Sequence, residues 1–465
     1  MAEEVGLKRG LGFWSTWAMC LGLVTCSTTM MMTGWGFGDL GAGFTYTHLI
    51  ALAYIILVAL GFAELATTYP RASSLEYYTS MAIGRVAGVT VGLWYGFKDI
   101  FGLSAESTLG GFILESFFPQ IPWWGWAVLI LTIFLITNLL GITIAGYVQL
   151  ALLVIMILSY FAIGVVGFLF APPEGLAYLG QTFLAPPPSV IYAGTPGGLP
   201  SVLVMTLMGV WLFVGVEVAA PLAEEIKNPH KIIPLAMTMS MVTLFLVREF
   251  TGLAWAASVP QDVLLGAPFP HVAAAEYLLG APGAIWFAII SFLAIGTTVN
   301  AVLAGATRVL YGMATEGYLP RLFGWLHPKF RTPWGSLGLL YAIMLLIIGL
   351  SATTLGAETP FTLALVCCFV FMLFYLFIFI DVLVLRFKKP EEKRPFRMGG
   401  PTRFPILAFI GLIATIIILV YSLAPPYGDP TTLYYGGPYC IVLFIVALII
   451  YYVRAAGKPS TPPSS

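Results

Sequence analysis

Several ionisable residues stand inside long apolar stretches of this sequence, where charge is costly. Glu217 follows two glycines in one stretch, and Lys98, Asp99 and Glu106 share another. A charged side chain at the centre of a bilayer costs roughly 2.5–3.5 kcal/mol on insertion scales, so its default interpretation is functional. Because burial favours the neutral form of a carboxyl group, Glu217 is a candidate for proton exchange near neutral pH. The alternative is a structural acid that joins its helix to neighbouring helices.

Spacing limits which of these charges share a helix face. Lys98 and Glu106 are eight residues apart and lie on one face, whereas Lys98 and Asp99 point about 100° apart. Lys98 can therefore pair with Glu106 or Glu217, or bind a substrate carboxylate, and a structural ion pair is the favoured interpretation. Arg248 and its neighbour Glu249, in a further apolar stretch, receive the same structural interpretation.

A polar, glycine-rich run over 26–39 interrupts the first long apolar stretch. Irregular backbone at membrane depth is tolerated only where it is buried in protein or lines a cavity. Interrupted segments at matching places in two halves of a chain indicate a binding site. We therefore expect this run to line a substrate site, although its threonines can instead bond only to their own helix carbonyls. The candidate substrate-binding residues here are Ser27, Thr28, Thr29 and Met30.

A second interruption is expected between Leu203 and Pro234, where Gly215 beside the acid at 217 predicts a helix that opens, which makes Gly215 a candidate substrate-binding residue. Trp211, which precedes it, presents an indole face suited to an ammonium group, or simply packs in its helix. The amide of Asn300 can contact a substrate or join two helices. Glu64 ends an apolar segment near the expected cytoplasmic side, where a gating or packing role is expected.

Composition places the chain among membrane proteins. It has 465 residues, of which 59% are hydrophobic and 9% are charged, against ~25% charged residues in soluble domains. Zero net charge gives no indication of nucleic-acid binding, and the five cysteines form neither a disulfide framework nor a metal-binding spacing. No HExxH, GxSxG or nucleotide-binding P-loop occurs, so we expect neither an enzyme with catalytic residues nor an ATP-driven pump. We expect no metal site and no cofactor.

Apolar segments long enough to span a bilayer predict an all-α polytopic membrane protein. Charge sets its orientation: Lys and Arg fall almost entirely in alternate loops, which predicts a multi-pass protein of the cell membrane with both termini cytoplasmic. The twelve candidate transmembrane helices lie near 14–43, 46–69, 84–117, 124–144, 147–170, 200–224, 232–258, 283–312, 333–350, 359–386, 403–424 and 434–453. Residues 262–280 are expected to form a short surface helix.

Two motifs resemble the amino acid–polyamine–organocation (APC) superfamily. The first matches its sixth transmembrane helix, and the second matches the end of helix eight and the following loop. The matching residues are 215–217, 223–224, 227–231 and 234 in the first motif, and 308, 313–314, 316–317, 319–320, 327–328 and 332–337 in the second. Together with the number of spans, the resemblance covers nearly the whole chain.

This resemblance implies a leucine-transporter-like fold with a 5+5 inverted repeat and two extra C-terminal helices. The divisions are a cytoplasmic N-terminus (1–13), the first repeat (14–170), an extracellular loop (171–199), the second repeat (200–386), a cytoplasmic basic loop (387–402), two last helices (403–453) and a cytoplasmic tail (454–465). It also implies a secondary transporter, or permease, that moves small amino acids or related amines by alternating access. In that scheme Glu217 is the helix-six acid linked to protonation, and Trp211 and Asn300 face the substrate.

The sequence departs from the superfamily pattern at two places. Many members have Gly-Ser-Gly at the helix-one break, where backbone amides hold the substrate carboxylate, but residues 28–30 here lack glycine. The run 33–38 is instead similar to the ethanolamine-permease branch. Some proton-coupled relatives carry a lysine in helix five in place of sodium, whereas 147–170 contains no charged residue. Coupling to H+, coupling to Na+ and exchange therefore all stay open.

Two other functions compete with an amino acid permease. The first is an ethanolamine- or polyamine-type amine transporter, or an amino acid/amine exchanger, which the missing glycines favour. The second, more remote, is a substrate sensor that does not transport, although the tail after Tyr452 is short for signalling. The expected partners are a small-molecule substrate and the lipid bilayer, and the oligomeric state is not indicated.

Overall fold

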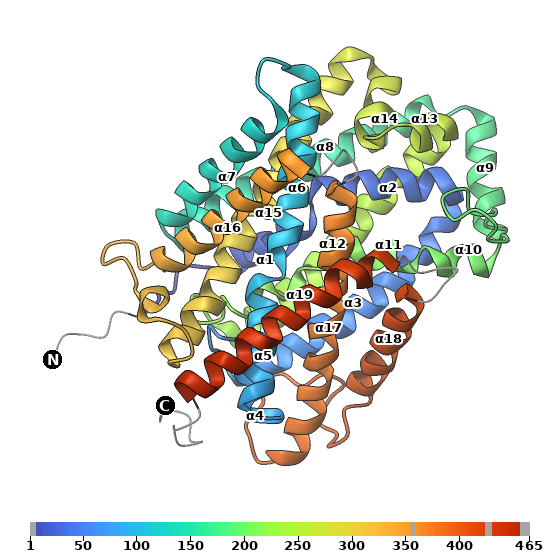
Figure 1. Cartoon of the computed structure of the whole chain (residues 1–465). Coiled ribbons are helices and arrows are strands. Elements are labelled where there is room, and N and C mark those ends of the chain that lie inside the picture. Colours follow the sequence, from blue (N-terminus) through green and yellow to red (C-terminus); the bar gives the residue numbers. More distant parts are fainter. Residues whose placement is uncertain (1–5, 355–358, 424–429, 456–465) are drawn as a thin grey trace.

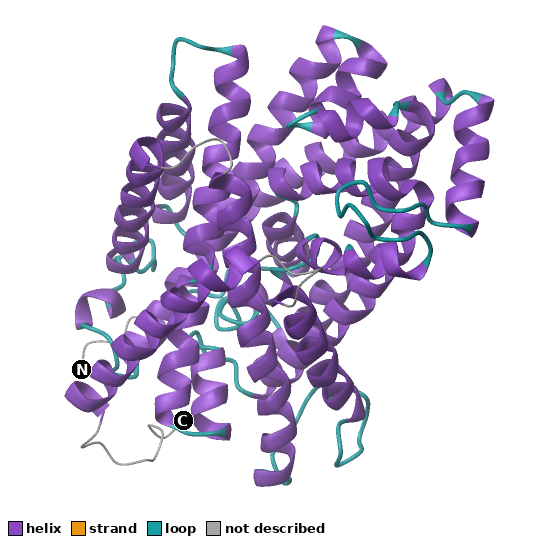
Figure 2. Cartoon of the chain, turned by 45° about the vertical axis from the view of Figure 1, so that its right-hand side comes forward, coloured by secondary structure: helices purple, strands orange, loops and turns teal. Residues whose placement is uncertain are grey.

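The computed structural model describes residues 6–354, 359–423 and 430–455, and over these residues it is a bundle of helices without β-strands (Figures 1 and 2). Seven helices in this part of the chain are long and apolar enough to cross a membrane, and four further apolar helices are shorter. The expected polytopic, all-α class is therefore confirmed. The number of crossings is not fixed by these lengths alone.

Each predicted apolar segment contains helix. In chain order the segments hold α1 (Phe13–Val24) with α2 (Ser27–Leu40), α3 (Phe44–Thr68), α5 (Arg85–Phe97) with α6 (Asp99–Phe117), α7 (Trp123–Leu139), α8 (Ile142–Phe170), α10 (Leu199–Val204) with α11 (Thr206–Trp211) and the 3-10 turn η2 (Val216–Ala219), α12 (Pro229–Ser258), α15 (Ala281–Thr315), α16 (Trp334–Thr354), α17 (Thr359–Lys388), α18 (Ile406–Leu423) and α19 (Pro430–Ile450).

Short elements cover the two ends of the bundle. They are η1 (Gly41–Gly43), α4 (Leu75–Ala82), α9 (Pro173–Leu184), α13 (Gln261–Gly266), α14 (Pro270–Leu279), η3 (Arg321–Gly324) and η4 (Tyr451–Ala455). In Figure 1, α13 and α14 lie at the upper end of the molecule and α4 lies at the lower end. The single surface helix expected over 262–280 is in fact two helices.

The segment 171–199, predicted as a loop, contains the helix α9. Pro173 stands in its first turn, where the fixed φ of proline favours a helix start. The hydroxyl of Thr182 accepts a hydrogen bond from the backbone N–H of Ala42 at 3.0 Å, which fixes α9 on η1. The proline and glycine content of the segment indicated a loop, but Pro173 stands where a helix tolerates proline, and the helix continues through Gly175 and Gly180.

The first apolar segment is interrupted, as predicted, but over a shorter stretch. Only Thr25 and Cys26 separate α1 from α2, so the expected interruption over 26–39 is wrong beyond its first residue. The polar run is helical, and the helix satisfies its hydroxyl groups, as the hydroxyl of Thr33 donates to the carbonyl of Thr29 at 2.7 Å. The helix is buried by protein over nearly its whole length.

The second interruption follows Trp211, where α11 ends, and confirms that the helix opens beside Glu217. Gly215 takes a φ of 118°, a backbone conformation that residues with a Cβ rarely adopt. A Cβ built on Gly215 would lie 2.1 Å from the Cδ2 atom of Leu23 in α1. Glycine is therefore required both by the backbone angle and by the close approach of α1.

α1 connects the two interruptions because it packs in the interior of the bundle. It contacts α8, α12, α15 and η2, so the end of α1 and the opened part of the second segment are neighbours. Helices from both halves of the chain thus surround a single region of irregular backbone. Side chains from these helices must satisfy the hydrogen-bonding groups that the interruptions free.

Substitution of Gly215 by alanine is expected to destabilise the protein by on the order of 2 kcal/mol, because the residue would adopt a strained φ and clash with Leu23. Thermal unfolding of the purified protein measures the effect. Gly338→Ala is the matched control, because Gly338 lies in α16 and a Cβ there meets no atom within 4 Å. Equal melting temperatures for both variants would contradict the conclusion that the backbone at position 215 requires glycine.

Candidate functional site

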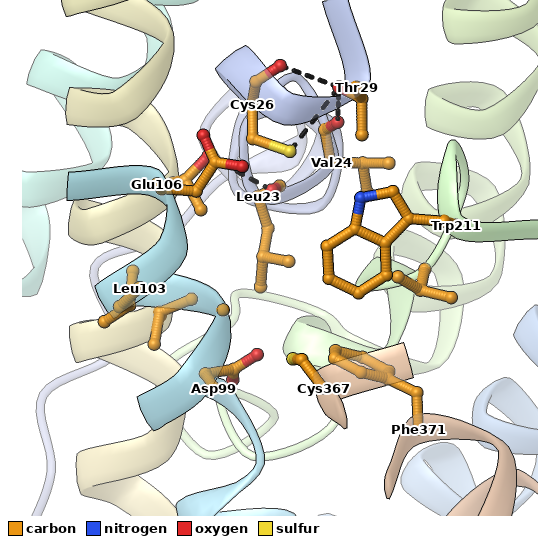
Figure 3. Close-up of a pocket in the computed structure, with 14 residues that line it drawn as sticks. Leu23, Val24, Cys26, Thr29, Asp99, Leu103, Glu106, Trp211, Cys367 and Phe371 are labelled. Carbon is orange, nitrogen blue, oxygen red and sulfur yellow. Dashed lines mark hydrogen bonds between the residues drawn. The ribbon is translucent and has the colours of Figure 1, made fainter. Parts of the chain in front are cut away.

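An internal cavity of about 30 Å³ lies where the two interruptions face α6 and α17 (Figure 3). A water molecule needs roughly 10–15 Å³ of such space, so the cavity has room for only about two or three waters. A larger ligand would require the lining side chains to move. The lining residues are Leu23, Val24, Cys26, Thr29, Asp99, Gly102, Leu103, Glu106, Trp211, Val214, Thr298, Val302, Cys367 and Phe371.

The N-terminus of α2 is bonded by the carboxylate of Glu106 on α6. The backbone N–H of Ser27 donates to Oε2 at 2.8 Å, and that of Thr28 donates to Oε1 at 3.2 Å. The hydroxyl of Thr28 also donates to Oε1. First-turn N–H groups carry partial positive charge and have no hydrogen-bond partner within their own helix. A buried carboxylate there accepts their hydrogen bonds and balances their charge. Glu106 therefore acts as the cap of α2.

The C-terminal ends of α1 and α11 are bonded by the guanidinium of Arg248 on α12. One nitrogen donates to the carbonyl of Val24 at 2.8 Å and to the hydroxyl of Thr29, and another donates to the carbonyl of Leu212. Free carbonyls at a helix C-terminus carry partial negative charge, which a cation stabilises. One buried arginine thus joins both interruptions.

This role of Arg248 was missed by the sequence analysis, which paired it with its neighbour. Glu249 instead contacts Nδ1 of His48 at 3.0 Å and accepts a hydrogen bond from Thr45. The only available signal was an arginine in an apolar stretch. Its partners are backbone carbonyls far away in the sequence, and no residue type marks them.

Lys98 pairs with two acids below the cavity. Its ammonium contacts Asp99 and lies 3.3 Å from Oε1 of Glu217, while the ring of Phe371 lies 4.3 Å away. The second oxygen of Glu217 accepts a hydrogen bond of 2.8 Å from Tyr375. Of the two acids predicted as partners of Lys98, Glu217 forms the ion pair, and an ion pair between Lys98 and Glu106 is absent from the described contacts. Asp99 was missed because adjacent helix residues diverge, yet the flexible lysine stem turns back to reach it.

Trp211 connects the two interruptions through its indole. Its Nε1–H donates to the hydroxyl of Thr28 at 3.3 Å, and its ring meets that of Phe371 edge-on with centroids 6.5 Å apart. Figure 3 shows the indole of Trp211 and the carboxylate of Asp99 bordering the same space. The predicted residues Thr28, Thr29, Trp211, Glu217, Lys98 and Glu106, with the opening at Gly215, are thus brought together.

Asn300 and Met30 lie outside the cavity lining. The Asn300 amide accepts hydrogen bonds from the side chains of Thr137 and Asn138, and donates to Gln149 and the carbonyl of Ala145. Its hydrogen-bonding capacity is used between α7, α8 and α15, which matches the interhelical alternative. Met30 is fully buried in a separate apolar cluster, and its neighbour Ser27 contributes its backbone amide rather than its hydroxyl.

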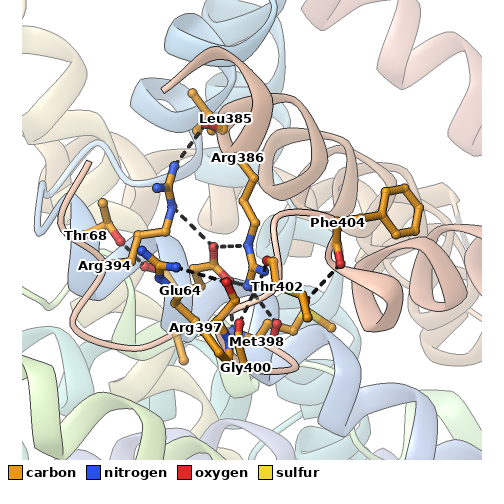
Figure 4. Close-up of polar contacts among 12 residues, drawn as sticks. Glu64, Thr68, Leu385, Arg386, Arg394, Arg397, Met398, Gly400, Thr402 and Phe404 are labelled. Atoms are coloured by element: carbon orange, nitrogen blue, oxygen red, sulfur yellow. Dashed lines mark hydrogen bonds and ion pairs between the residues drawn. The ribbon is translucent and has the colours of Figure 1, made fainter. Parts of the chain in front are cut away.

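Glu64 lies apart from the cavity, at the end of α3 (Figure 4). Arg386 donates to both of its carboxylate oxygens, at 2.9 and 2.6 Å, and the backbone N–H of Met398 donates at 2.8 Å. Arg394 adds an ion pair at 3.5 Å. This cluster fixes the segment between α17 and α18 to α3.

Among the described residues, no group of three or more His, Cys, Asp or Glu side chains is placed to hold a metal ion. The cavity instead combines acids, aromatic rings and two interrupted helices. Interrupted helices that meet at an internal site are the arrangement by which secondary transporters bind small substrates. Fold and site together define a membrane protein of the permease class.

The chain belongs to the amino acid permease family, whose sequence model matches residues 11–450. It is accordingly a member of the APC superfamily, as the two sequence motifs indicated. Proteins of this family are permeases rather than enzymes.

Curated relatives include three permeases of different named substrates. The chain is 23% identical to the branched-chain amino acid permease of Bacillus subtilis (strain 168), covering 90% of this chain and 89% of that protein. It is 27% identical to the low-affinity putrescine importer of Escherichia coli (strain K12), covering 68% and 70%. It is 26% identical to the gamma-aminobutyric acid permease of Bacillus subtilis (strain 168), covering 82% and 80%.

Removal of the Lys98 charge is expected to be strongly destabilising. Lys98→Met leaves two buried acids without their cation, and breaking such a pair costs roughly 3–5 kcal/mol. Adding Glu217→Gln should recover part of this loss, because it removes one of the two stranded charges. Thermal unfolding of both single variants and the double variant measures the coupling.

Lys231→Met serves as the control for that cycle, because Lys231 is an exposed residue on α12. It should leave the melting temperature near that of the parent protein. Single-variant losses that simply add in the Lys98→Met/Glu217→Gln protein would show that the two side chains do not interact.

Proposed function

We propose that this protein is a secondary transporter that moves small amino acids or related amines across the cell membrane by alternating access. The observation that carries the proposal is the meeting of two interrupted helices, α1/α2 and α11/η2, on one internal cavity. The named substrates of the relatives, amino acids and an amine, support the same class. The substrate would bind between the interruptions, beside Trp211.

The proposal includes a topology of twelve crossings, with both termini cytoplasmic. The interruptions fall in the first and sixth apolar segments, which are corresponding positions if five-helix repeats run over 14–170 and 200–386. α18 and α19 would then be additions to the two repeats. Orientation rests on the concentration of Lys and Arg in alternate loops.

Proton coupling is the mode that the contacts support best. Glu217 lies beside the opened backbone of the second interruption and faces Lys98, Asp99 and Tyr375. Adding or removing a proton there would change the charge next to the element that must move. The ends of the interrupted helices are already bonded by Glu106 and Arg248, so they need no sodium ion to satisfy them.

Glu217→Gln tests the proton role. In proteoliposomes the parent protein is expected to change its uptake rate with pH, and the variant should show a flat pH profile with binding partly retained. Glu115→Gln is the control, because Glu115 lies on α6 outside the cavity lining. A pH profile in Glu217→Gln that matches the parent profile would remove Glu217 from the coupling mechanism.

Replacement of sodium tests the proposal that transport does not need a sodium ion. Uptake into proteoliposomes should be the same in sodium and in potassium buffers of equal ionic strength, because the helix ends carry their own charged partners. A fall of roughly tenfold on sodium removal, equivalent to about 1.4 kcal/mol, would contradict this expectation and assign the coupling to sodium.

A further inference from the structure

The anion position at the first interruption is already filled by a side chain of the protein. Helix N-termini bind anions through their free N–H groups, and interrupted transporter helices use them to hold the acidic group of a substrate. At α2 these N–H groups, from Ser27 and Thr28, bond the carboxylate of Glu106. A substrate carboxylate would have to displace a buried charge to reach them.

The hydrogen bonds of Glu106 leave little capacity for another partner. Oε1 accepts from the N–H and the hydroxyl of Thr28, and Oε2 accepts from the N–H of Ser27 at 2.8 Å and that of Thr28 at 3.3 Å. An ionised carboxylate has about four acceptor sites, so its acceptors are nearly saturated. Glu106 therefore takes the place of a substrate carboxylate and has little capacity left to bind a substrate itself.

The cavity wall offers no positive charge to a second carboxylate. Its lining includes the acids Asp99 and Glu106 but no Lys, Arg or His. The two nearest cations are engaged elsewhere, Lys98 with Asp99 and Glu217, and Arg248 with backbone carbonyls. An anionic group entering this space would find no cation free to pair with it, which is expensive at this depth.

Charge balance points in the same direction. Around the two interruptions, three acids face two cations, so the described cluster carries a net charge of 2 − 3 = −1 when all five groups are ionised. An organic ammonium ion would neutralise it, whereas a zwitterionic amino acid would leave it negative and add a carboxylate. The five groups are Lys98, Asp99, Glu106, Glu217 and Arg248.

An ammonium group has suitable surroundings in the cavity. Asp99 contacts Lys98 through Oδ2 and can offer its second carboxylate oxygen, and Trp211 supplies an aromatic ring, whose face attracts cations. The ring of Phe371 also borders the space and already attracts the Lys98 ammonium, 4.3 Å away. Figure 3 shows these three side chains bordering the lower and right-hand part of the space, away from Glu106. The part of the site that can accept a ligand is therefore the cation-binding part.

We propose that the substrate is an organic amine without a carboxylate, and that Glu106 determines this specificity by occupying the place of a substrate carboxylate at the N-terminus of α2. The inference rests on the proposed transport function and narrows its substrate class. It predicts that each amine is preferred to the amino acid from which it differs only by loss of the carboxyl group.

Matched pairs of compounds test the wild-type protein. Ethanolamine against serine and putrescine against ornithine differ only in the carboxyl group. At least one amine should raise the melting temperature of the purified full chain and enter proteoliposomes, with half-saturation at least roughly tenfold lower than for its amino acid. An amino acid that binds as well as its amine would overturn the inference and leave the transport function standing. Absence of uptake for all four compounds and for the branched-chain amino acids would overturn the transport proposal itself.

Glu106→Ala tests the mechanism of that specificity. The variant frees the N-terminus of α2, so acetate or propionate should raise its melting temperature, and serine or ornithine should gain affinity relative to the amine. Glu115→Ala, the same substitution on the same helix outside the cavity, should show neither effect.

Glu106→Gln provides the second variant if the alanine protein does not fold. It preserves the side-chain volume and one acceptor oxygen, so the amine preference should weaken through the loss of one negative charge. A Glu106→Gln protein with the wild-type ratio of amine to amino acid affinity, or a folded Glu106→Ala protein that carboxylates do not stabilise, would overturn the role of Glu106.

Discussion

Helix ends inside a membrane protein must find hydrogen-bond partners without the help of water, and the two interruptions create several such ends in one place. Glu106 bonds the N–H groups at the start of α2, and Arg248 bonds the carbonyls at the ends of α1 and α11. Each side chain has the charge that opposes the partial charge of the helix end it meets. The irregular backbone is therefore held by fixed charges.

A second set of contacts holds the chain together at one end of the bundle. On the side of the bundle where α4 lies, the backbone N–H groups of Gly10 and Leu11 donate to the carbonyl of Glu225, and the Glu225 side chain pairs with Arg308 at 2.7 Å. Glu64 is held in its own arginine cluster. Opening the cavity toward that side would require some of these contacts to separate, because the segment after η2 is bonded both to the residues that precede α1 and to α15. A change of protonation at Glu217 would act on this same segment.

The sequence was sufficient for the broad architecture and for part of the candidate site. It missed Asp99 and Arg248, and it included Met30 and Asn300, which lie outside the cavity lining. Apolar segments of bilayer length predicted the helices, and glycines beside a buried acid predicted the opening at Gly215. It made the first interruption too long, because polar residues and glycines indicated irregular backbone where the chain is helical and the threonine hydroxyls bond to carbonyls of their own helix. Partners such as Glu106 with the α2 amides could not be read from the chain, because backbone groups carry no sequence signal. The role of Asn300 could not be read from the sequence either, because its hydrogen-bond partners lie on α7 and α8 and are brought near only by packing.

The most direct test of a substrate site at the two interruptions uses the native cysteines. Cys26 and Cys367 line the cavity, whereas Cys440 lies in α19 outside it. Variants that keep only one of the five cysteines, at position 26, 367 or 440, would be reconstituted and labelled with a membrane-permeant maleimide, with and without a saturating transported substrate. Substrate should slow labelling of Cys26 and Cys367 and leave Cys440 unchanged. Labelling of the two cavity cysteines at the same rate with and without substrate would contradict the placement of the substrate between the interrupted helices.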